Sequence, residues 1–521
     1  MADPVLPPWA LTRAGEAPPI AGNEVTLLRD GPEVFPAWIQ DIASAQHFVL
    51  FENYIFNNDR TGNAIADALI ERAAAGVAVH LLYDWFGCIG TSRRLWRRLA
   101  EGGVDVRVFN PPRLSDPIRS VQRNHRKSLC VDGRIGYVGG LCVGDAWAGD
   151  PAQGIPPWRD TAVRIVGPAA VALCRAFNET WSAAGPPLPA AHLPPLPPPD
   201  KRRGGAPVRV ISGLPGRSRI YRIIQVLLSL ACRRIWLTDA YFLTPPPLYE
   251  ALLAAARDGV DVRVLVPGRS DLPWVSWIGR AGYTGLLRAG VRIFEWEGPM
   301  LHAKTSVIDG LWCRVGSSNL NLASLLTNWE LDVTVEDATL ARAMEEMFLE
   351  DIGNARELIL RTRRRRFQGH IQRAVPVMIQ GSRQPMGAGR AGPSGRRRRD
   401  LAPPTGRAGA AMARASAAVL GAALRRQFEQ NTWSVAGATG ALLLGAGGLG
   451  LWQPRIVGGF LSLLLIWFGV AALGRAVGQW WRQSRRQGLW GRTRALLRGH
   501  LQQAKGREVS QRSPPPNQTE P

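Results

Sequence analysis

Two stretches decide the fold: His125-Arg-Lys-Ser-Leu-Cys-Val-Asp132 and, 177 residues later, His302-Ala-Lys-Thr-Ser-Val-Ile-Asp309. Both read His-x-Lys-x-x-x-x-Asp, and both run through a short apolar stretch into an Asp-Gly pair, which is a turn signal between strands. The 521-residue chain has only seven His, and two of them take the same place in the same pattern. A single His-x-Lys pair is typical of an exposed strand, whereas two copies in matching context indicate an internal duplication.

The match continues upstream of both motifs. In each copy an apolar strand-like run is followed by a helical stretch, a Gly-Val strand and then the motif strand. The helical stretches are 64–75 and 248–258, and the strands that follow them begin at Gly76 and Gly259. Strands that alternate with helices predict an α/β fold. We therefore expect two α/β lobes with one shared site where they meet.

His and Lys two residues apart on a strand point to the same face. Two such pairs suit phosphoryl chemistry, because one imidazole can attack phosphorus, a second can protonate the leaving oxygen, and two ammonium groups can hold the phosphate charge. The two Asp are expected to close the turn after each motif strand. The predicted catalytic set consists of the motif residues His125, Lys127, Asp132, His302, Lys304 and Asp309.

The doubled motif resembles the signature of the phospholipase D superfamily, and within it the chain looks most like bacterial cardiolipin synthases. The resemblance covers about residues 23–355. Outside the motifs it rests on Glu52-Asn-Tyr-Ile-Phe56, Leu82-Tyr-Asp84, Trp158-Arg-Asp160, Gly167-Pro168, Phe177 with Trp181, Tyr241-Phe242 and Asn328-Trp-Glu330. One position departs from the family pattern. The small-residue turn after the second motif ends in Asn319, whereas the first copy has Cys142.

The resemblance implies two lobes of the phospholipase D type and catalysis without a metal or other cofactor, through a phosphohistidine. We assign His125 as the nucleophile and His302 as the acid and base. Lys127, Lys304 and Asn319 are then expected to hold the phosphate oxygens.

Three further residues complete the expected site. Ser317 is expected to bind phosphate beside Asn319. Asp160 and Glu330, each about 30 residues after its motif, are expected to hold the second nitrogen of a catalytic imidazole.

The possible functions differ in the molecule that accepts the phosphatidyl group. With the glycerol hydroxyl of phosphatidylglycerol the products are cardiolipin and glycerol, whereas with water the enzyme is a phospholipid hydrolase. A nuclease of the same superfamily is a third possibility. The runs of four Arg at 363–366 and 396–399 fit it, but the membrane-length apolar segments described below do not, so no nucleic acid is expected as partner. A non-catalytic lipid-binding scaffold is disfavoured because both motifs are complete.

The positive charge is confined to the last third of the chain. Residues 1–355 carry 36 basic and 36 acidic residues, and residues 356–521 hold the whole net charge of +23. The segments 433–452 and 456–474 contain no charged residue and have the length of membrane-spanning helices. Basic flanks on both sides predict a helical hairpin in the inner membrane, with the lobes and both flanks in the cytoplasm and anionic lipids as partners.

The six Cys have no pair spacing, so a metal site is not predicted. The expected organisation has seven parts: a Pro-rich irregular arm (1–22), the first lobe (23–185), a stiff Pro-rich linker (186–205), the second lobe (206–355), a basic disordered tail (356–430), the transmembrane hairpin (431–475) and a basic amphipathic segment (476–521).

Overall fold

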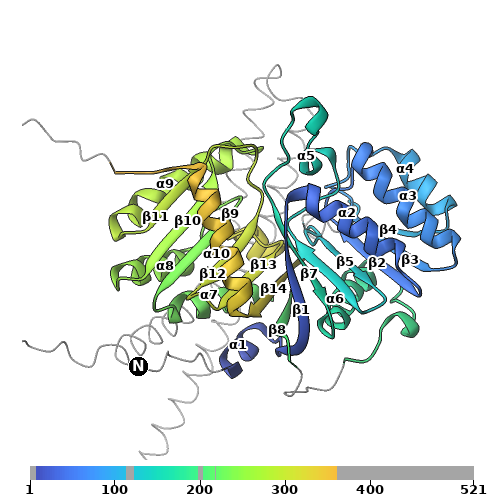
Figure 1. Ribbon diagram of the computed structural model, residues 1–521, viewed down its shortest axis with the longest axis horizontal. Coiled ribbons are helices and arrows are strands. Elements are labelled where there is room, and N and C mark those ends of the chain that lie inside the picture. Colours follow the sequence, from blue (N-terminus) through green and yellow to red (C-terminus); the bar gives the residue numbers. More distant parts are fainter. Residues whose placement is uncertain (1–7, 113–121, 197–203, 218, 361–521) are drawn as a thin grey trace, which may run out of the picture.

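Strands from both halves of the chain form one mixed sheet in the computed structural model (Figure 1). The structure describes residues 8–112, 122–196, 204–217 and 219–360. The order of strands is β15-β11-β10-β9-β12-β13-β14-β8-β1-β7-β6-β5-β2-β3-β4. Read outward from the central β1–β8 pair, the first seven strands of one half repeat the order of the other. The fold is therefore a duplicated α/β unit, as the doubled motif predicts.

The first lobe contains seven strands and most of the helices that precede residue 186. Its strands are β1 (Ile20–Arg29), β2 (Phe48–Asn53), β3 (Ala78–Asp84), β4 (Asp105–Phe109), β5 (Ser128–Val131), β6 (Ile135–Gly139) and β7 (Thr161–Val166). Its helices are α2 (Asp30–Ala43), α3 (Arg60–Ala74), α4 (Arg93–Glu101), α5 (Asp145–Ala148) and α6 (Ala169–Ala184). Buried residues of α2, α3 and α4 share one core with the sheet, and those of α6 share another.

The second lobe repeats this plan. Its strands are β8 (Ala206–Gly213), β9 (Arg234–Asp239), β10 (Asp261–Pro267), β11 (Arg292–Trp296), β12 (Lys304–Ile308), β13 (Trp312–Gly316), β14 (Glu330–Glu336) and β15 (Ala355–Glu357). Its helices are α7 (Arg219–Leu230), α8 (Pro246–Arg257), α9 (Pro273–Ala289) and α10 (Ala338–Gly353). The core under α7, α8 and α9 is mostly aliphatic and also contains Phe242, Tyr283 and Trp312.

The lobes are joined by strand pairing and by a shared core. Strand β1 pairs antiparallel with β8, with Asn23 opposite Ala206. Val163 of β7 and Val333 of β14 belong to one buried cluster that contains residues from both halves. The large shared apolar surface favours one relative position of the lobes, since burying it from water is the main favourable term.

The Asp-Gly turns that follow the motifs form as predicted. Asp132 and Gly133 have φ of 53° and 63°, and Asp309 and Gly310 have φ of 56° and 68°. Two successive residues at positive φ are typical of tight hairpin turns, for which Asp-Gly is a preferred pair. Each turn connects a motif strand to the next strand of its lobe, β5 to β6 and β12 to β13.

Two expectations about the ends of the lobes were wrong in part. The arm is not irregular throughout, because helix α1 (Pro8–Gly15) precedes β1 and buries Leu11 in the core of the second lobe. Proline suits the first position of a helix, so its presence did not exclude one. The linker, expected to be stiff and extended, packs on the first lobe through buried Leu188. Strand β15 includes Arg356 and Glu357, so the ordered lobe ends after residue 355.

None of the helices in the described part of the chain is long and apolar enough to cross a membrane. The segments 433–452 and 456–474, predicted as a hairpin, lie outside the described residues, as does most of the basic tail.

Candidate active site

The motif residues lie where the two lobes meet. His125 and Lys127 immediately precede β5, and His302 and Lys304 lie at the corresponding start of β12. Because β5 runs antiparallel to β2 and β12 runs antiparallel to β9, the motifs start at the carboxyl ends of β2 and β9. Open α/β sheets bind ligands at this edge. All four side chains are buried.

Each imidazole contacts a carboxylate of the other lobe. Nδ1 of His125 lies 3.0 Å from Oε2 of Glu330, and Nδ1 of His302 lies 2.7 Å from Oδ2 of Asp160. The two residues named from the sequence as orienting groups therefore both face an imidazole, and they do so in crossed pairs. Neither lobe can complete its own His–carboxylate pair.

Backbone pairing between the lobes produces the crossing. Asn124 forms a parallel bridge with Trp329, and Arg159 forms one with Leu301. The backbone N–H of His125 donates to the carbonyl of Trp329 at 2.9 Å. The same bond recurs at the other motif, where the N–H of His302 donates to the carbonyl of Arg159 at 2.7 Å. Each motif strand is thereby aligned with the segment of the other lobe that carries the carboxylate.

Further donors hold the two carboxylates. The Trp147 indole N–H donates to Oδ2 of Asp160 at 3.1 Å, and the hydroxyl of Ser317 donates to Oε2 of Glu330. Ser317 also accepts the N–H of Leu331 at 3.0 Å, and it does not line the cavity described below. The structure thus places Ser317 against Glu330, and its role in binding phosphate stays a prediction. Trp147 was not singled out from the sequence, which offers no signal for its contact with a carboxylate.

The hydrogen-bond geometry fixes the imidazole tautomers. An ionised carboxylate only accepts, so Nδ1 of each ring must donate, which leaves the lone pair on Nε2 when the ring is neutral. Burial lowers the pKa of His125 and of His302, and neighbouring Lys side chains add to this effect. Burial alone would raise the pKa of Asp160, but His302 and Lys304 outweigh it and leave that pKa lowered. The resting pair therefore combines a neutral imidazole with a charged carboxylate.

The Lys side chains lie inside the same buried region. The Nζ of Lys127 donates to the carbonyl of His125 at 2.5 Å, and that of Lys304 donates to the carbonyl of His302. Burial lowers the pKa of both ammonium groups, that of Lys304 to about 8. An anion placed between them would favour the charged form of each, which suits a site for a phosphodiester.

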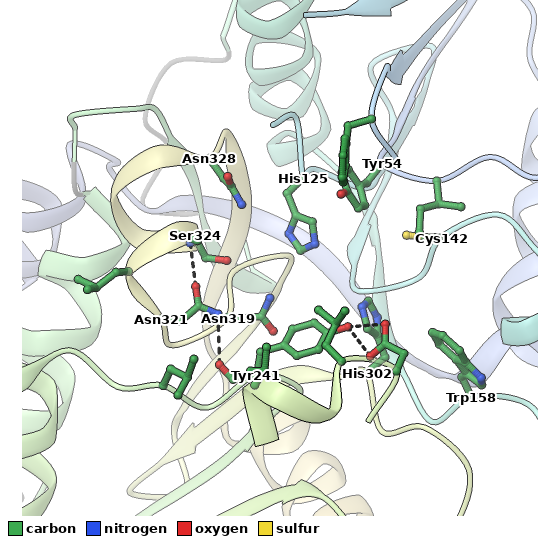
Figure 2. Close-up of a pocket in the computed structure, with 18 of the residues that line it drawn as sticks. Tyr54, His125, Cys142, Trp158, Tyr241, His302, Asn319, Asn321, Ser324 and Asn328 are labelled. Atoms are coloured by element: carbon green, nitrogen blue, oxygen red, sulfur yellow. Dashed lines mark hydrogen bonds between the residues drawn. The ribbon is translucent and has the colours of Figure 1, made fainter. Parts of the chain in front are cut away.

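Both His line one cavity of about 550 Å³ (Figure 2). Asn319 and Cys142, the residues at the ends of the two small-residue turns, line it as well. The side-chain oxygen of Asn319 has no hydrogen-bond partner among the described residues. Much of the remaining wall is apolar or aromatic: Ile55, Phe86, Trp147, Trp158, Leu243, Leu272, Val275 and Leu322. The cavity therefore combines the polar side chains of His125, His302 and Asn319 with an apolar wall that suits an apolar ligand.

Two tyrosines complete the symmetry of the site. The ring of Tyr54 lies 5.0 Å from that of His125, and the ring of Tyr241 lies 6.1 Å from that of His302. Both also lie beneath Lys ammonium groups, with Lys127 at 5.0 Å from Tyr54 and Lys304 at 5.8 Å from Tyr241. The sequence carried a signal for these contacts, because both Tyr follow the second strand of their lobe. No role had been assigned to them.

Cys142 interrupts the symmetry. Its thiol is buried beside the cavity, and burial raises its pKa although Lys127 opposes the rise. A neutral thiol is a weaker hydrogen-bonding group than the amide of Asn319. The first half of the site therefore offers less polar contact to a phosphate than the second half.

The motif Asp residues lie outside the cavity. Asp132 accepts the backbone N–H groups of Gln46, His47 and Phe48, each at 2.8 Å. Asp309 accepts three equivalent N–H groups before β9, from residues 232–234. Their place in the predicted catalytic set is corrected accordingly. They hold the turn after each motif strand, which agrees with the role expected of that position.

Within the described residues, no group of three or more His, Cys, Asp or Glu is arranged to hold a metal ion. The fold and the doubled His/Lys pair define a phospholipase D-like protein.

Comparison with known proteins narrows this class. The family described as "Cardiolipin synthase, PLD-like domain" matches residues 38–144 and 224–352. Cardiolipin synthase A of Pseudomonas putida is 34% identical over 353 residues, which cover 67% of this chain and 72% of that protein. The major cardiolipin synthase of Bacillus subtilis (strain 168) is 31% identical over 364 residues, which cover 69% and 74%. The chain belongs to the cardiolipin synthase family.

A solved structure supports the fold independently of sequence. The phosphatidylserine synthase of Haemophilus influenzae Rd KW20 superposes with a TM-score of 0.53 at 16% identity, over 67% of this chain and 92% of that one.

Proposed function

We propose that the protein is a phosphatidyltransferase that joins two phosphatidylglycerol molecules into cardiolipin and releases glycerol. The observation that carries the proposal is the pair of crossed His–carboxylate contacts at one cavity, His125 with Glu330 and His302 with Asp160. Membership of the cardiolipin synthase family supports the same substrate class.

In the first step, Nε2 of His125 attacks the phosphorus of one phosphatidylglycerol. The bond between phosphorus and the headgroup oxygen breaks, and His302 gives a proton from Nε2 to the departing glycerol. The arriving phosphate is an anion, so it raises the pKa of His302 and allows the ring to carry that proton. A phosphatidyl group bound to His125 remains, which is covalent catalysis with a positioned general acid.

In the second step, the terminal hydroxyl of another phosphatidylglycerol gives its proton to Nε2 of His302 and attacks the same phosphorus. The bond to His125 breaks, and cardiolipin is formed. Lys127, Lys304 and the amide of Asn319 stabilise the charge on the non-bridging oxygens in both steps. No cofactor is required.

The nature of the cavity wall favours an alcohol over water as acceptor. Apolar residues that include Leu243, Val275 and Leu322 line the same cavity as the two imidazoles. Such a wall disfavours water and suits the glycerol backbone of a second lipid. A hydrolase with water as acceptor would use the same His residues, and the products separate the two cases.

The proposal places the enzyme at the bacterial inner membrane on the cytoplasmic side. The segments 433–452 and 456–474 would anchor it as a hairpin, and the basic tail would contact anionic lipids rather than nucleic acid.

The test follows labelled glycerol. The full-length protein is incubated with phosphatidylglycerol vesicles in which the headgroup glycerol carries an isotopic label. Transfer leaves half of the label in cardiolipin and releases the other half as glycerol. If all the label is released and phosphatidic acid is the only lipid product, the protein is a hydrolase. If neither product forms, the proposal is wrong.

A further inference from the structure

Large apolar side chains are exposed on three segments around the cavity mouth. Phe86, Leu272 and Leu322 line the cavity and are 56%, 39% and 55% exposed. Each has an exposed apolar neighbour on its own segment: Ile89, Trp277 and Leu326, at 66%, 76% and 44%. We call these six residues the apolar rim. A soluble protein seldom exposes such a group without a partner for it.

The size of the cavity indicates what the rim contacts. About 550 Å³ is the volume of a site for a drug-sized molecule. A diacyl phospholipid carries two long acyl chains in addition to its phosphate and headgroup. With the phosphate between His125 and His302, the chains must pass the cavity mouth and lie outside it, next to the rim.

Positive charge surrounds the rim. Arg93 and Arg94 are exposed at the start of α4, directly after the segment of Ile89, and Arg269 is exposed just before Leu272. Arg217 is exposed next to the backbone bond between the Gly216 N–H and the Leu326 carbonyl. The three segments 86–94, 269–278 and 321–327 contain a single acidic residue, Asp271, which accepts the hydroxyl of Tyr241. Apolar residues bordered by arginines match an anionic lipid surface.

We propose that the apolar rim is a membrane-docking surface of the catalytic lobes, which inserts among the lipids of an anionic bilayer and admits the phosphate of a lipid to the cavity without the lipid leaving the membrane. This inference rests on the proposed lipid substrate and extends it, since it assigns membrane contact to the lobes themselves and not only to the C-terminal tail. It predicts that lobes held near a bilayer still need the rim to reach their substrate.

The first test compares two forms of one substrate in the full-length protein. The double variant Ile89→Ser with Trp277→Ser removes two exposed rim residues that do not line the cavity. Turnover on phosphatidylglycerol vesicles should fall at least tenfold. Turnover on a short-chain phosphatidylglycerol, kept below the concentration at which it forms micelles, should stay within twofold.

A matched control comes from α1. Trp9 is 66% exposed, and in Figure 1 α1 lies at the opposite edge of the molecule from α9. Trp9→Ser should leave both activities unchanged. The proposal is overturned if the rim variant retains full turnover on vesicles, or if it loses both activities equally.

The second test does not depend on activity. In a Cys232→Ser background, Trp277→Cys and Trp9→Cys are each labelled with an environment-sensitive fluorophore. Vesicles of phosphatidylglycerol and phosphatidylcholine should shift the emission of the label at 277 to the blue and leave that at 9 unchanged. An unchanged emission at 277 refutes the docking surface even if cardiolipin is made. A blue shift without any lipid product leaves the surface intact and refutes the proposed reaction.

Discussion

Removing the charge of Glu330 should stop the nucleophilic step in the other lobe. Glu330→Gln keeps the size of the side chain 3.0 Å from Nδ1 of His125, but an amide can donate as well as accept. Ser317 keeps the side-chain oxygen at the position of Oε2, so the NH2 group takes the position of Oε1, which lies 3.1 Å from Nδ1. An NH2 group there donates to Nδ1 and favours the tautomer whose proton is on Nε2. The lone pair that attacks phosphorus is then lost.

The expected loss of kcat can be taken from serine proteases, in which a similar substitution also leaves the catalytic imidazole in the wrong tautomer. There the equivalent change lowers kcat by about 10⁴, and we expect a loss of about 10³ to 10⁴ here, which corresponds to about 4 to 5.5 kcal/mol of activation free energy. KM should change little, because Glu330 does not line the cavity.

The assay is a single-turnover measurement with short-chain phosphatidylglycerol. Glu336→Gln is the control, since this residue lies at the other end of the same strand, β14, and does not line the cavity. A kcat of Glu330→Gln within tenfold of the unaltered protein would contradict the proposed orientation of His125 by the second lobe.

Three further predictions concern charge and symmetry. Burial lowers the pKa of Lys304 to about 8, so kcat/KM should fall above pH 8 as the ammonium group loses its proton. Lys304→Arg should abolish this fall in a pH profile measured up to pH 10. Cys142→Asn restores the residue that matches Asn319, and it should lower KM for short-chain substrate by two- to fivefold with kcat nearly unchanged. Burial lowers the pKa of His80, so as the pH falls the unfolded state takes up a proton near pH 6.5, before the folded state does. The melting temperature measured by calorimetry should therefore fall as the pH decreases below 6.5. The dependence of the melting temperature on pH should be weaker in His80→Gln.

Much of the fold follows from local sequence. The Asp-Gly turns at Asp132 and Asp309 require positive φ, which restricts the residue types that can occupy them, so the hairpins after the motifs were predictable. The alternation of strands and helices along the chain predicted the two α/β lobes. The Pro-rich composition of residues 1–22 predicts an irregular arm and gives no sign of helix α1, although Leu11 lies on the buried side of that helix.

The site was predictable as a set of residues and not as a set of contacts. Asp160 and Glu330 each follow their motif by about 30 residues and stand in the Trp-x-Asp and Asn-x-Glu positions of the family pattern, which identified them as orienting groups. Their crossing depends on the pairing of β1 with β8 and on the bridges at Asn124 and Arg159, which link segments far apart in sequence. No local pattern encodes such tertiary contacts. The contact of Ser317 with Glu330 was hidden for the same reason.

The proposed mechanism has one covalent intermediate at one site that both lobes form. It is tested most directly by quenching the full-length protein during turnover of short-chain phosphatidylglycerol and measuring the mass of the intact chain and of its peptides. We expect one phosphatidyl group per chain, attached to His125, and none in His125→Ala. No adduct in the unaltered protein, or two adducts per chain on His125 and His302 together, would contradict it.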